Sequence, residues 1–430
     1  MGVVLVGVGQ IVQREPGGLD AVGLMVAAAR RAADDAGAPD LLGRLDAVLV
    51  PEGTWAPGDA GRAVATAVGS PAARTVLARV GILQTALVRG AARHDVALVV
   101  GGEAKASARA GVAAAPLPPG PADEVWSPTG DIVMALEIER GLAVPVQSYA
   151  IQQSAAGTDG LDDLWDRFAA IAARNPDAWG PPADGDRLIA TPYRRRHCSD
   201  WNVDMGVALL FCSTAVADEL GVPAGRRVHP HAVVEANEMV PLTQRPDIAR
   251  SPGFAAIAEQ VGEPDHVDLY SCFPSAVMIQ AAELGLPLDR SLTVTGGMAF
   301  AGGPLNSAAL HAMATMAQVL RDDPGSTGLV TAVSGMLTKQ GATTWSTDPS
   351  PDGLRSVELP ATAARVEVDP GYVGEAVVDG STVVHDRSGP TTAVVVATTP
   401  AGTRVVAVGA PEHAAASGEV VRVEGAALRS

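Results

Sequence analysis

Short apolar segments alternate with amphipathic segments from the start of the chain, and this alternation narrows the possible folds more than any other feature. Residues 2–9 are apolar and run into glycine, the pattern of a strand buried on both faces. Residues 20–36 repeat alanine, leucine and valine at helical spacing, with Asp20 placed to cap the start and Gly37 to end the helix. Further strands are expected at 45–50, 72–80 and 96–101, and a helix at 83–93. This order predicts a mostly parallel sheet covered by helices.

The same alternation returns in the second half of the chain. Strands are expected at 205–213, 266–269 and 328–333, and helices at 214–220, 274–284 and 308–320. The two halves have the same order of strands and helices but no detectable sequence similarity. We therefore expect that the fold is duplicated although the sequence is not.

Two stretches depart from this pattern. Residues from about 105 to 200 are rich in proline and glycine around a helix expected at 162–173, and an excursion of this length is typical of a binding or lid element. Beyond Pro349, β-branched residues alternate with glycine, proline and aspartate, and strands are expected at 364–368, 374–378, 382–386, 392–399, 403–408 and 420–425. These segments predict a small, barrel-like antiparallel β domain.

Charge and composition exclude several classes of protein. The formal charge of −17 disfavours nucleic acid and anionic membrane surfaces, since the only basic run is the short one at 194–196. Apolar residues make up 47% of the chain and aromatic residues 3%, so the interior must consist of closely packed alanine, valine and leucine. No apolar run is long enough for a membrane span. The three cysteines, Cys198, Cys212 and Cys272, do not have the spacing of metal ligands, so we expect no metal site. Since three cysteines cannot all pair, they also fit a reduced, cytoplasmic compartment.

Four segments occur in an order that resembles the thiolase superfamily over roughly residues 1–350. They are LVVGGEA (98–104), VDMGVALLFCSTAVADELGVP (203–223), VDLYSCFPSAV (267–277) and TVTGGMAFAGGPLN (293–306). The chain is most similar to sterol-carrier-type thiolases and to thiolase-like, acetyl-CoA acetyltransferase-like proteins with an extra C-terminal β domain.

The resemblance implies a five-layer α-β-α-β-α fold of two βαβαβαββ halves, a loop domain covering a coenzyme A ester, and a homodimer. The expected division is an N-terminal half at 1–203 that includes the loop domain at about 105–200, a C-terminal half at 204–355, and a small β-barrel-like domain at 356–430. The resemblance also places the protein in lipid metabolism.

The catalytic residues of the family are largely replaced. The nucleophilic cysteine belongs before the helix that starts near Gly81, where the sequence RTVLARVGILQ contains no thiol. The His-Asp-Cys-Phe loop matches residues 270–273, so Tyr270 replaces the histidine while Cys272 persists. The Gly-His-Pro turn matches residues 302–304 with Gly303 in place of histidine, and the late Cys-x-Gly turn matches residues 333–335.

Tyr270 and Cys272 are therefore the catalytic candidates. The residues expected to bind substrate are Ser271, Gly302, Gly303, Asn306 and Gly335. Cysteine between tyrosine and phenylalanine is also consistent with a buried apolar role.

Each neighbouring polar residue has two interpretations. Amides of the glycines at 296–297 and 302–303 suit either a thioester oxygen or tight turns. Asn306 suits substrate or, more simply, the cap of the helix at 308–320. His311 is expected to pack that helix, and His266 and Asp268 share one face of a strand. Lys339 suits either a coenzyme A phosphate or substrate carboxylate, or a solvated surface; the surface is the simpler interpretation.

The sequence leaves two function classes open. The first is an acyltransferase-family protein that handles acyl-CoA thioesters with ordinary thiolysis lost or altered; retro-aldol cleavage suits it because no acyl-enzyme is needed. The second is a non-catalytic acyl-CoA or lipid binding or assembly protein. A ketosynthase-like condensing subunit would need a nucleophilic cysteine or a docking face for an acyl carrier, and the sequence indicates neither. We expect coenzyme A thioester as ligand and no covalently bound cofactor.

Overall fold

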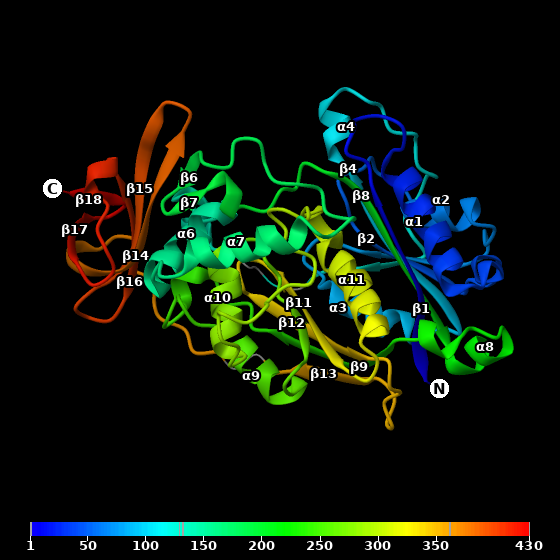
Figure 1. Ribbon diagram of the computed structural model, residues 1–430. Helices are drawn as coiled ribbons and strands as arrows, with labels where there is room; N and C mark the ends of the chain where they lie inside the picture. Colours follow the sequence, from blue (N-terminus) through cyan, green and yellow to red (C-terminus); the bar gives the residue numbers. More distant parts are fainter. Residues whose placement is uncertain (1, 129, 131–132, 361–362, 430) are drawn as a thin grey trace.

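Two β-sheets separated by a layer of helices make up most of the molecule (Figure 1). The structure, a computed structural model, describes residues 2–128, 130, 133–360 and 363–429. Helices also cover the outer face of each sheet, so the order of layers is the expected α-β-α-β-α. The five-layer architecture and the additional C-terminal β region are therefore confirmed.

The first sheet has six strands and is mixed rather than uniformly parallel. In spatial order they are β1 (Val3–Val12), β8 (Asp204–Ser213), β4 (Val96–Ala104), β2 (Ala47–Pro51), β3 (Arg74–Ala78) and β5 (Glu124–Trp126). β8 is antiparallel to both of its neighbours, whereas the pairs from β4 to β5 are parallel. Each strand from β1 to β4 follows or precedes a helix, as the alternation predicted.

The second sheet has five strands. They are β10 (His266–Asp268), β11 (Thr327–Ser334), β12 (Lys339–Ser346), β9 (His229–Asn237) and β13 (Arg355–Leu359). β9 and β12 form an antiparallel pair that the sequence pattern did not indicate, because both strands are buried along almost their whole length and carry polar residues among the apolar ones.

Six helices form the three helical layers. α1 (Ala21–Ala36) and α2 (Ala60–Ala67) cover the first sheet, α3 (Gln84–Ala91) and α11 (Ala308–Asp322) lie between the sheets, and α9 (Pro252–Val261) and α10 (Pro274–Glu283) cover the second. Asp20 caps α1 by accepting a hydrogen bond from the Gly23 amide at 2.8 Å, and Gly37 ends it with φ 66°, as expected. A short helix, α8 (Thr214–Glu219), follows β8.

Glycine and alanine let α1 lie unusually close to the first sheet. A Cβ atom at Gly7 of β1 would come within 1.9 Å of the Ala32 carbonyl oxygen in α1, and one at Gly9 within 2.1 Å of the Ala28 oxygen. Because no side chain separates helix from strand there, the two backbones are in direct contact. The low aromatic content of the sequence thus agrees with the short distance between the α1 layer and the first sheet.

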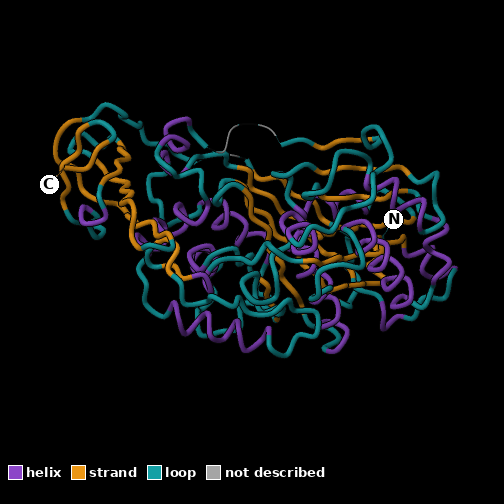
Figure 2. Tube along the Cα trace, turned by 90° about the horizontal axis from the view of Figure 1, so that it is seen from above, coloured by secondary structure: helices purple, strands orange, loops and turns teal. Residues whose placement is uncertain are grey.

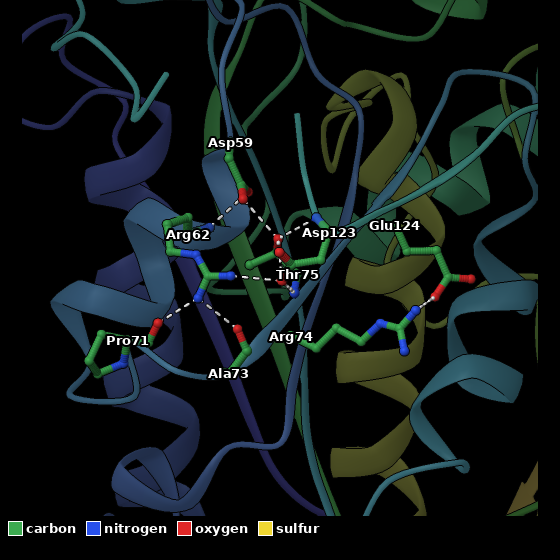
Figure 3. A network of polar contacts seen from close by, with 8 residues as sticks. All are labelled: Asp59, Arg62, Pro71, Ala73, Arg74, Thr75, Asp123 and Glu124. Carbon is green, nitrogen blue, oxygen red and sulfur yellow. Dashed lines mark hydrogen bonds and ion pairs between the residues drawn. The ribbon is translucent and has the colours of Figure 1, made fainter. Parts of the chain in front are cut away.

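β5 extends the first sheet at its β3 edge, and a polar network holds it there (Figure 3). Asp123, just before β5, accepts hydrogen bonds from the Thr75 amide at 2.8 Å and from Arg62 of α2 at 2.7 Å. The Thr75 amide lowers the pKa of Asp123, so the carboxylate stays charged. Arg74 forms an ion pair with Glu124 of β5 at 2.8 Å. Part of the excursion therefore belongs to the sheet.

Most of the rest of the excursion lies between the sheets and the C-terminal domain (Figure 1). This part contains α5 (Ala135–Glu139), α6 (Pro145–Ala156), α7 (Leu161–Ala172), β6 (Leu188–Ala190) and β7 (Tyr193–Arg194). The short helix α4 (Lys105–Arg109) instead contacts β8 and lies away from the C-terminal domain. α6 contacts the long strand β14, and β6 pairs with the same strand. These contacts connect the excursion, in which a binding or lid element was expected, to the C-terminal domain.

Five strands of the C-terminal domain close into a barrel, which stands at one end of the molecule (Figure 2). They are β14 (Val373–Asp386), β15 (Gly389–Thr398), β16 (Arg404–Gly409), β18 (Ala427–Arg429) and β17 (Val420–Glu424), and pairing of β15 with β14 completes the circle. The pair β16–β18 is parallel, and the strand expected at 364–368 is reduced to one bridge, Val368 to Arg404.

The limits of the structural units differ from those expected. β8 lies within the first sheet, so the expected boundary at 203/204 does not coincide with the boundary between the sheets. β13 pairs with β9, so the second sheet continues beyond 355/356. Parts of two expected segments, residues 129, 131–132, 361–362 and 430, lie outside the described residues. None of the described helices is long and apolar enough to cross a bilayer.

Candidate functional site

The loops that follow β10 and precede α11 are held together by one buried carboxylate. Asp268 ends β10 and is 5% exposed. Its Oδ2 accepts four hydrogen bonds of 2.9–3.0 Å, from the hydroxyls of Thr293 and Thr295 and from the amides of Val294 and Thr295. Burial raises the pKa of Asp268, against the effect of these donors. The carboxylate is thus an anchor for the 293–297 loop.

His266, which was expected to share one strand face with Asp268, has a different partner. His266 instead contacts Asp323 at 2.8 Å, because it lies at the exposed end of the strand while Asp268 faces the loops.

A small cavity opens between these loops, α11 and β1. Its volume is about 20 Å³, which is room for about one water molecule. The polar residues that line it are Gln10, Asn175, Asp177, Asp268, Tyr270, Ser271, Thr295, Gly302, His311 and Thr331. Three of the predicted site residues, Tyr270, Ser271 and Gly302, are therefore brought together.

Tyr270 is fixed at the cavity by its own backbone. Its amide donates to the Thr331 hydroxyl at 2.7 Å, and its carbonyl accepts from the Gln280 side chain at 2.8 Å. Burial raises the pKa of the Tyr270 phenol well above its usual value. The phenol consequently stays protonated near neutral pH and can donate a hydrogen bond.

Leu83 directly precedes α3, in the stretch where the resemblance leads us to expect the nucleophile. It is the N-cap residue of α3, which begins at Gln84 rather than at Leu83, and it is 3% exposed. Leu83 packs in an apolar cluster with Ala309 and Ala332, and Tyr270 lies against that cluster. The position beside Tyr270 therefore holds a branched apolar side chain and no thiol.

Cys272 lies among aromatic side chains rather than in the cavity lining. Its thiol forms a hydrogen bond with Tyr149, which stacks on Phe273 with ring centroids 4.8 Å apart. Burial raises the pKa of Cys272 to about 12. A thiol with this pKa stays protonated at neutral pH, so the geometry favours the apolar interpretation of this residue.

The glycine amides are mostly used within the protein. Those of Gly296 and Gly297 donate to the Thr293 and Thr295 hydroxyls, and the Gly303 amide donates to the Asp200 carbonyl at 2.8 Å. Among the described residues, the Gly302 amide has no acceptor. Gly302 has φ 100°, lines the cavity, and is the one glycine of the four that offers a free donor there.

Of the other predicted binding residues, one lines the cavity and two do not. Ser271 faces the cavity, and its hydroxyl accepts from the Met298 amide at 3.0 Å. Asn306 accepts from Gln84 of α3 at 2.6 Å and does not cap α11, because a 3-10 turn at Leu305–Ser307 intervenes and Ser307 takes the cap position. Gly335, with φ 59°, shapes the turn between β11 and β12 and lines neither the cavity at Tyr270 nor the larger one beside α3.

His311 joins the site instead of only packing its helix. Its Nδ1 lies 2.7 Å from Oε1 of Gln10, while Nε2 of Gln10 donates to Thr315 and Asp177 at 3.2 and 3.4 Å. These donations fix the amide orientation, so Nδ1 of His311 must carry the proton. Nε2 is left unprotonated, and within the described structure it has no hydrogen-bond partner.

The imidazole is neutral because burial lowers the pKa of His311 to about 3. His311 and Tyr270 both line the cavity, and the unpartnered Nε2 lone pair is a hydrogen-bond acceptor. Sequence patterns contain no signal for this role, since Gln10 and His311 are 301 positions apart.

A pH titration of stability tests the neutral state of His311. Between its folded pKa of about 3 and an unfolded value of about 6.5, the unfolded chain binds more protons, so stability falls as the pH decreases through this window and is retained above it. We expect the wild type to lose about 2 kcal/mol more than His311→Asn between pH 7 and pH 5, measured by urea unfolding. Parallel pH profiles for the two proteins would contradict a buried neutral imidazole.

Comparisons with known proteins give the fold a family context. No protein-family model matches the chain, and no curated protein matches it. The chain is similar to the solved structure of a monomeric SCP2-thiolase like protein type 1 (STLP1) from Mycobacterium smegmatis, with 24% identity and a TM-score of 0.79 over 99% of this chain and 97% of that one. It is also similar to the structure described as Ltp2-ChsH2(DUF35) aldolase, with 18% identity and a TM-score of 0.57 over 80% of this chain and 97% of that one. The resemblance to thiolase-like proteins is confirmed as a likeness of fold.

Proposed function

We propose that this protein binds acyl-CoA thioesters and cleaves the carbon–carbon bond of a 3-hydroxyacyl thioester by a retro-aldol reaction instead of thiolysis. The observation that carries the proposal is the replacement of the thiol position by Leu83 while a protonated phenol, Tyr270, stays in the adjacent cavity. The thiolase-like fold and the likeness to a structure described as an aldolase support it.

The reaction needs an acceptor for the hydroxyl proton and hydrogen-bond donors for the enolate oxygen. A base removes the proton of the 3-hydroxyl, the bond between carbons 2 and 3 breaks to leave a ketone or aldehyde, and the electron pair forms a thioester enolate. Protonation of carbon 2 then completes the acetyl or acyl thioester. His311 Nε2 accepts the hydrogen bond of the 3-hydroxyl and, because it does not retain the proton, passes it on to carbon 2 as the bond breaks. The Tyr270 phenol and the Gly302 amide are donors to the enolate oxygen.

Substrate binding requires the covering segment to move, because the cavity holds only about one water molecule. Residues of the excursion cross the site and bond to it through the backbone. The amides of Ser199 and Asp200 donate to Cys272 and Met298 at 3.0 and 2.9 Å, and the amide of Trp179 donates to Ala301 at 2.9 Å. We infer that this covering segment opens when a thioester binds.

Turnover assays test the proposal directly. Purified protein is incubated with a 3-hydroxyacyl-CoA, and the ketone or aldehyde and the shortened acyl-CoA are measured in equal amounts by mass spectrometry. Acetoacetyl-CoA with free coenzyme A serves as the thiolysis control and is expected to remain unchanged. An acyl group found covalently attached to the protein during thiolysis would contradict the proposal.

Non-catalytic binding of an acyl-CoA or lipid is the second candidate. The small cavity and the missing thiol favour it, because neither is needed by a carrier. Saturable binding of an acyl-CoA without products in the assay above would assign this function.

A homodimer, expected from the resemblance, stays a prediction. The similar mycobacterial protein is described as monomeric. Sedimentation equilibrium of the purified protein distinguishes the two states.

A further inference from the structure

A second, larger cavity lies on the other side of Leu83. Its volume is about 300 Å³, within the size range of small-ligand sites, and it shares no lining residue with the cavity at Tyr270. One face of α3, the loop after β5 and the edge of the second sheet surround it. Nothing in the proposed retro-aldol chemistry uses this space.

Lys339 reaches this cavity from the start of β12. The residue is 5% exposed, which corrects the expectation of a surface lysine, because the turn before β12 places it beneath the loop at Gly81. Its Nζ donates to the Gly81 carbonyl at 2.7 Å, and among the described residues no carboxylate lies within ion-pair distance. Burial lowers the pKa of Lys339. An ammonium group with three donors therefore has one protein acceptor and no counter-charge.

The carboxylates in the same cavity are already engaged. Arg89 forms ion pairs with Glu235 at 3.2 Å and with Glu358 at 2.6 Å. Arg93, at the exposed rim, forms no ion pair within the described structure. The cavity lining thus contains three cationic side chains and two carboxylates. Its net charge is +1, although the whole chain carries −17.

The opposite wall of the cavity is apolar. It consists of Ile82, Leu83, Ala86, Trp126, Pro128 and Met239. A buried cation facing an apolar wall matches a molecule with one anionic end and a compact hydrocarbon body, since each part then replaces water with a suitable contact.

We propose that this cavity binds a small monocarboxylate, with the carboxylate on Lys339 and the hydrocarbon body against the wall formed by Leu83 and Trp126. One negative charge balances the net charge of the cavity, whereas a phosphate dianion would exceed it. Asn237, across from Lys339 in the register of β9 and β12, adds an amide donor beside the anion.

The lysine content of the chain makes a direct test possible. Lys105 and Lys339 are the only two lysines in the sequence, so protein labelled with [13C]lysine gives two Cε signals, one for each site. Hexanoate is titrated at constant ionic strength. We expect a saturable shift of the Lys339 signal with that of Lys105 unchanged, because Lys105 lies over the Trp201 ring, a residue absent from the cavity lining.

Variants separate recognition of the charge from general effects. Lys339→Met retains the buried volume and is expected to weaken hexanoate binding by about tenfold or more in calorimetry, whereas Lys105→Met leaves it unchanged. Tyr270→Phe also leaves it unchanged, which separates this site from the retro-aldol site. Hexanol tests the need for the charge and is expected to bind at least about tenfold more weakly than hexanoate.

Three results would overturn the inference. They are equal shifts of both lysine signals, equal affinity of wild type and Lys339→Met in calorimetry, or inorganic phosphate binding more tightly than hexanoate. The last would assign the cavity to phosphate-bearing ligands instead.

Discussion

Replacing Tyr270 with phenylalanine is expected to lower the retro-aldol turnover number by a factor of about 10²–10³ while acyl-CoA binding changes little. The variant keeps the ring that packs beside Leu83 and loses only the phenol oxygen, the side-chain donor of a residue that lines the cavity. Because that donor is needed only as charge develops on the thioester oxygen, its loss acts on turnover rather than on affinity. Steady-state kinetics with a 3-hydroxyacyl-CoA and calorimetry with the unreactive acyl-CoA measure the two quantities separately.

Cys272→Ala is the matched control for Tyr270→Phe. The two residues belong to the same loop, but the thiol of Cys272 lies against Tyr149 and does not line the cavity. We expect this variant to retain turnover within about threefold of the wild type. Equal losses in both variants would mean that the loop acts through its overall position, and an unaffected Tyr270→Phe enzyme would remove Tyr270 from the reaction.

Most strands and helices were predictable because their signals are local. The helix at α1 shows this well: its apolar spacing, Asp20 as cap and Gly37 as terminator all lie within one window of sequence, and all three are confirmed. By contrast, β5 is only three residues long and is defined by pairing with β3 and by the Arg62 and Thr75 contacts of Asp123. No periodicity can develop over three residues, so only tertiary structure reveals such a strand.

The site residues that belong to sequence motifs could be predicted. Those whose role depends on contacts between distant positions could not. Tyr270, Ser271 and Gly302 come from two motifs that the fold brings to one cavity. The orientation of His311 depends on Gln10, which is hundreds of positions away, and the tautomer follows from a hydrogen-bond chain that sequence does not show. Burial of Lys339 likewise depends on the distant loop at Gly81.

Gly7→Ala is expected to destabilise the protein far more than a methyl group added at a glycine with open space around it. A Cβ atom at this position of β1 would come within 1.9 Å of the Ala32 carbonyl oxygen and 3.0 Å of the Ala36 Cβ. The obstacle is backbone of α1 and not a flexible side chain, so the whole helix must move away from the sheet. α1 also contacts β8 and β4, which means that the displacement would disturb three strands at once. We expect a cost of about 3 kcal/mol or more in urea unfolding.

Gly43→Ala provides the matched comparison for this effect. Gly43 lies in the 3-10 turn at Pro39–Arg44, and a Cβ atom added there meets no atom within 4 Å. The same methyl group should therefore leave stability unchanged or raise it by about 0.5 kcal/mol, because alanine has fewer unfolded conformations than glycine. If Gly7→Ala unfolded at the same urea concentration as Gly43→Ala, α1 and β1 would have to be farther apart than the structure places them, and the close layering inferred from the scarcity of aromatic residues would be wrong.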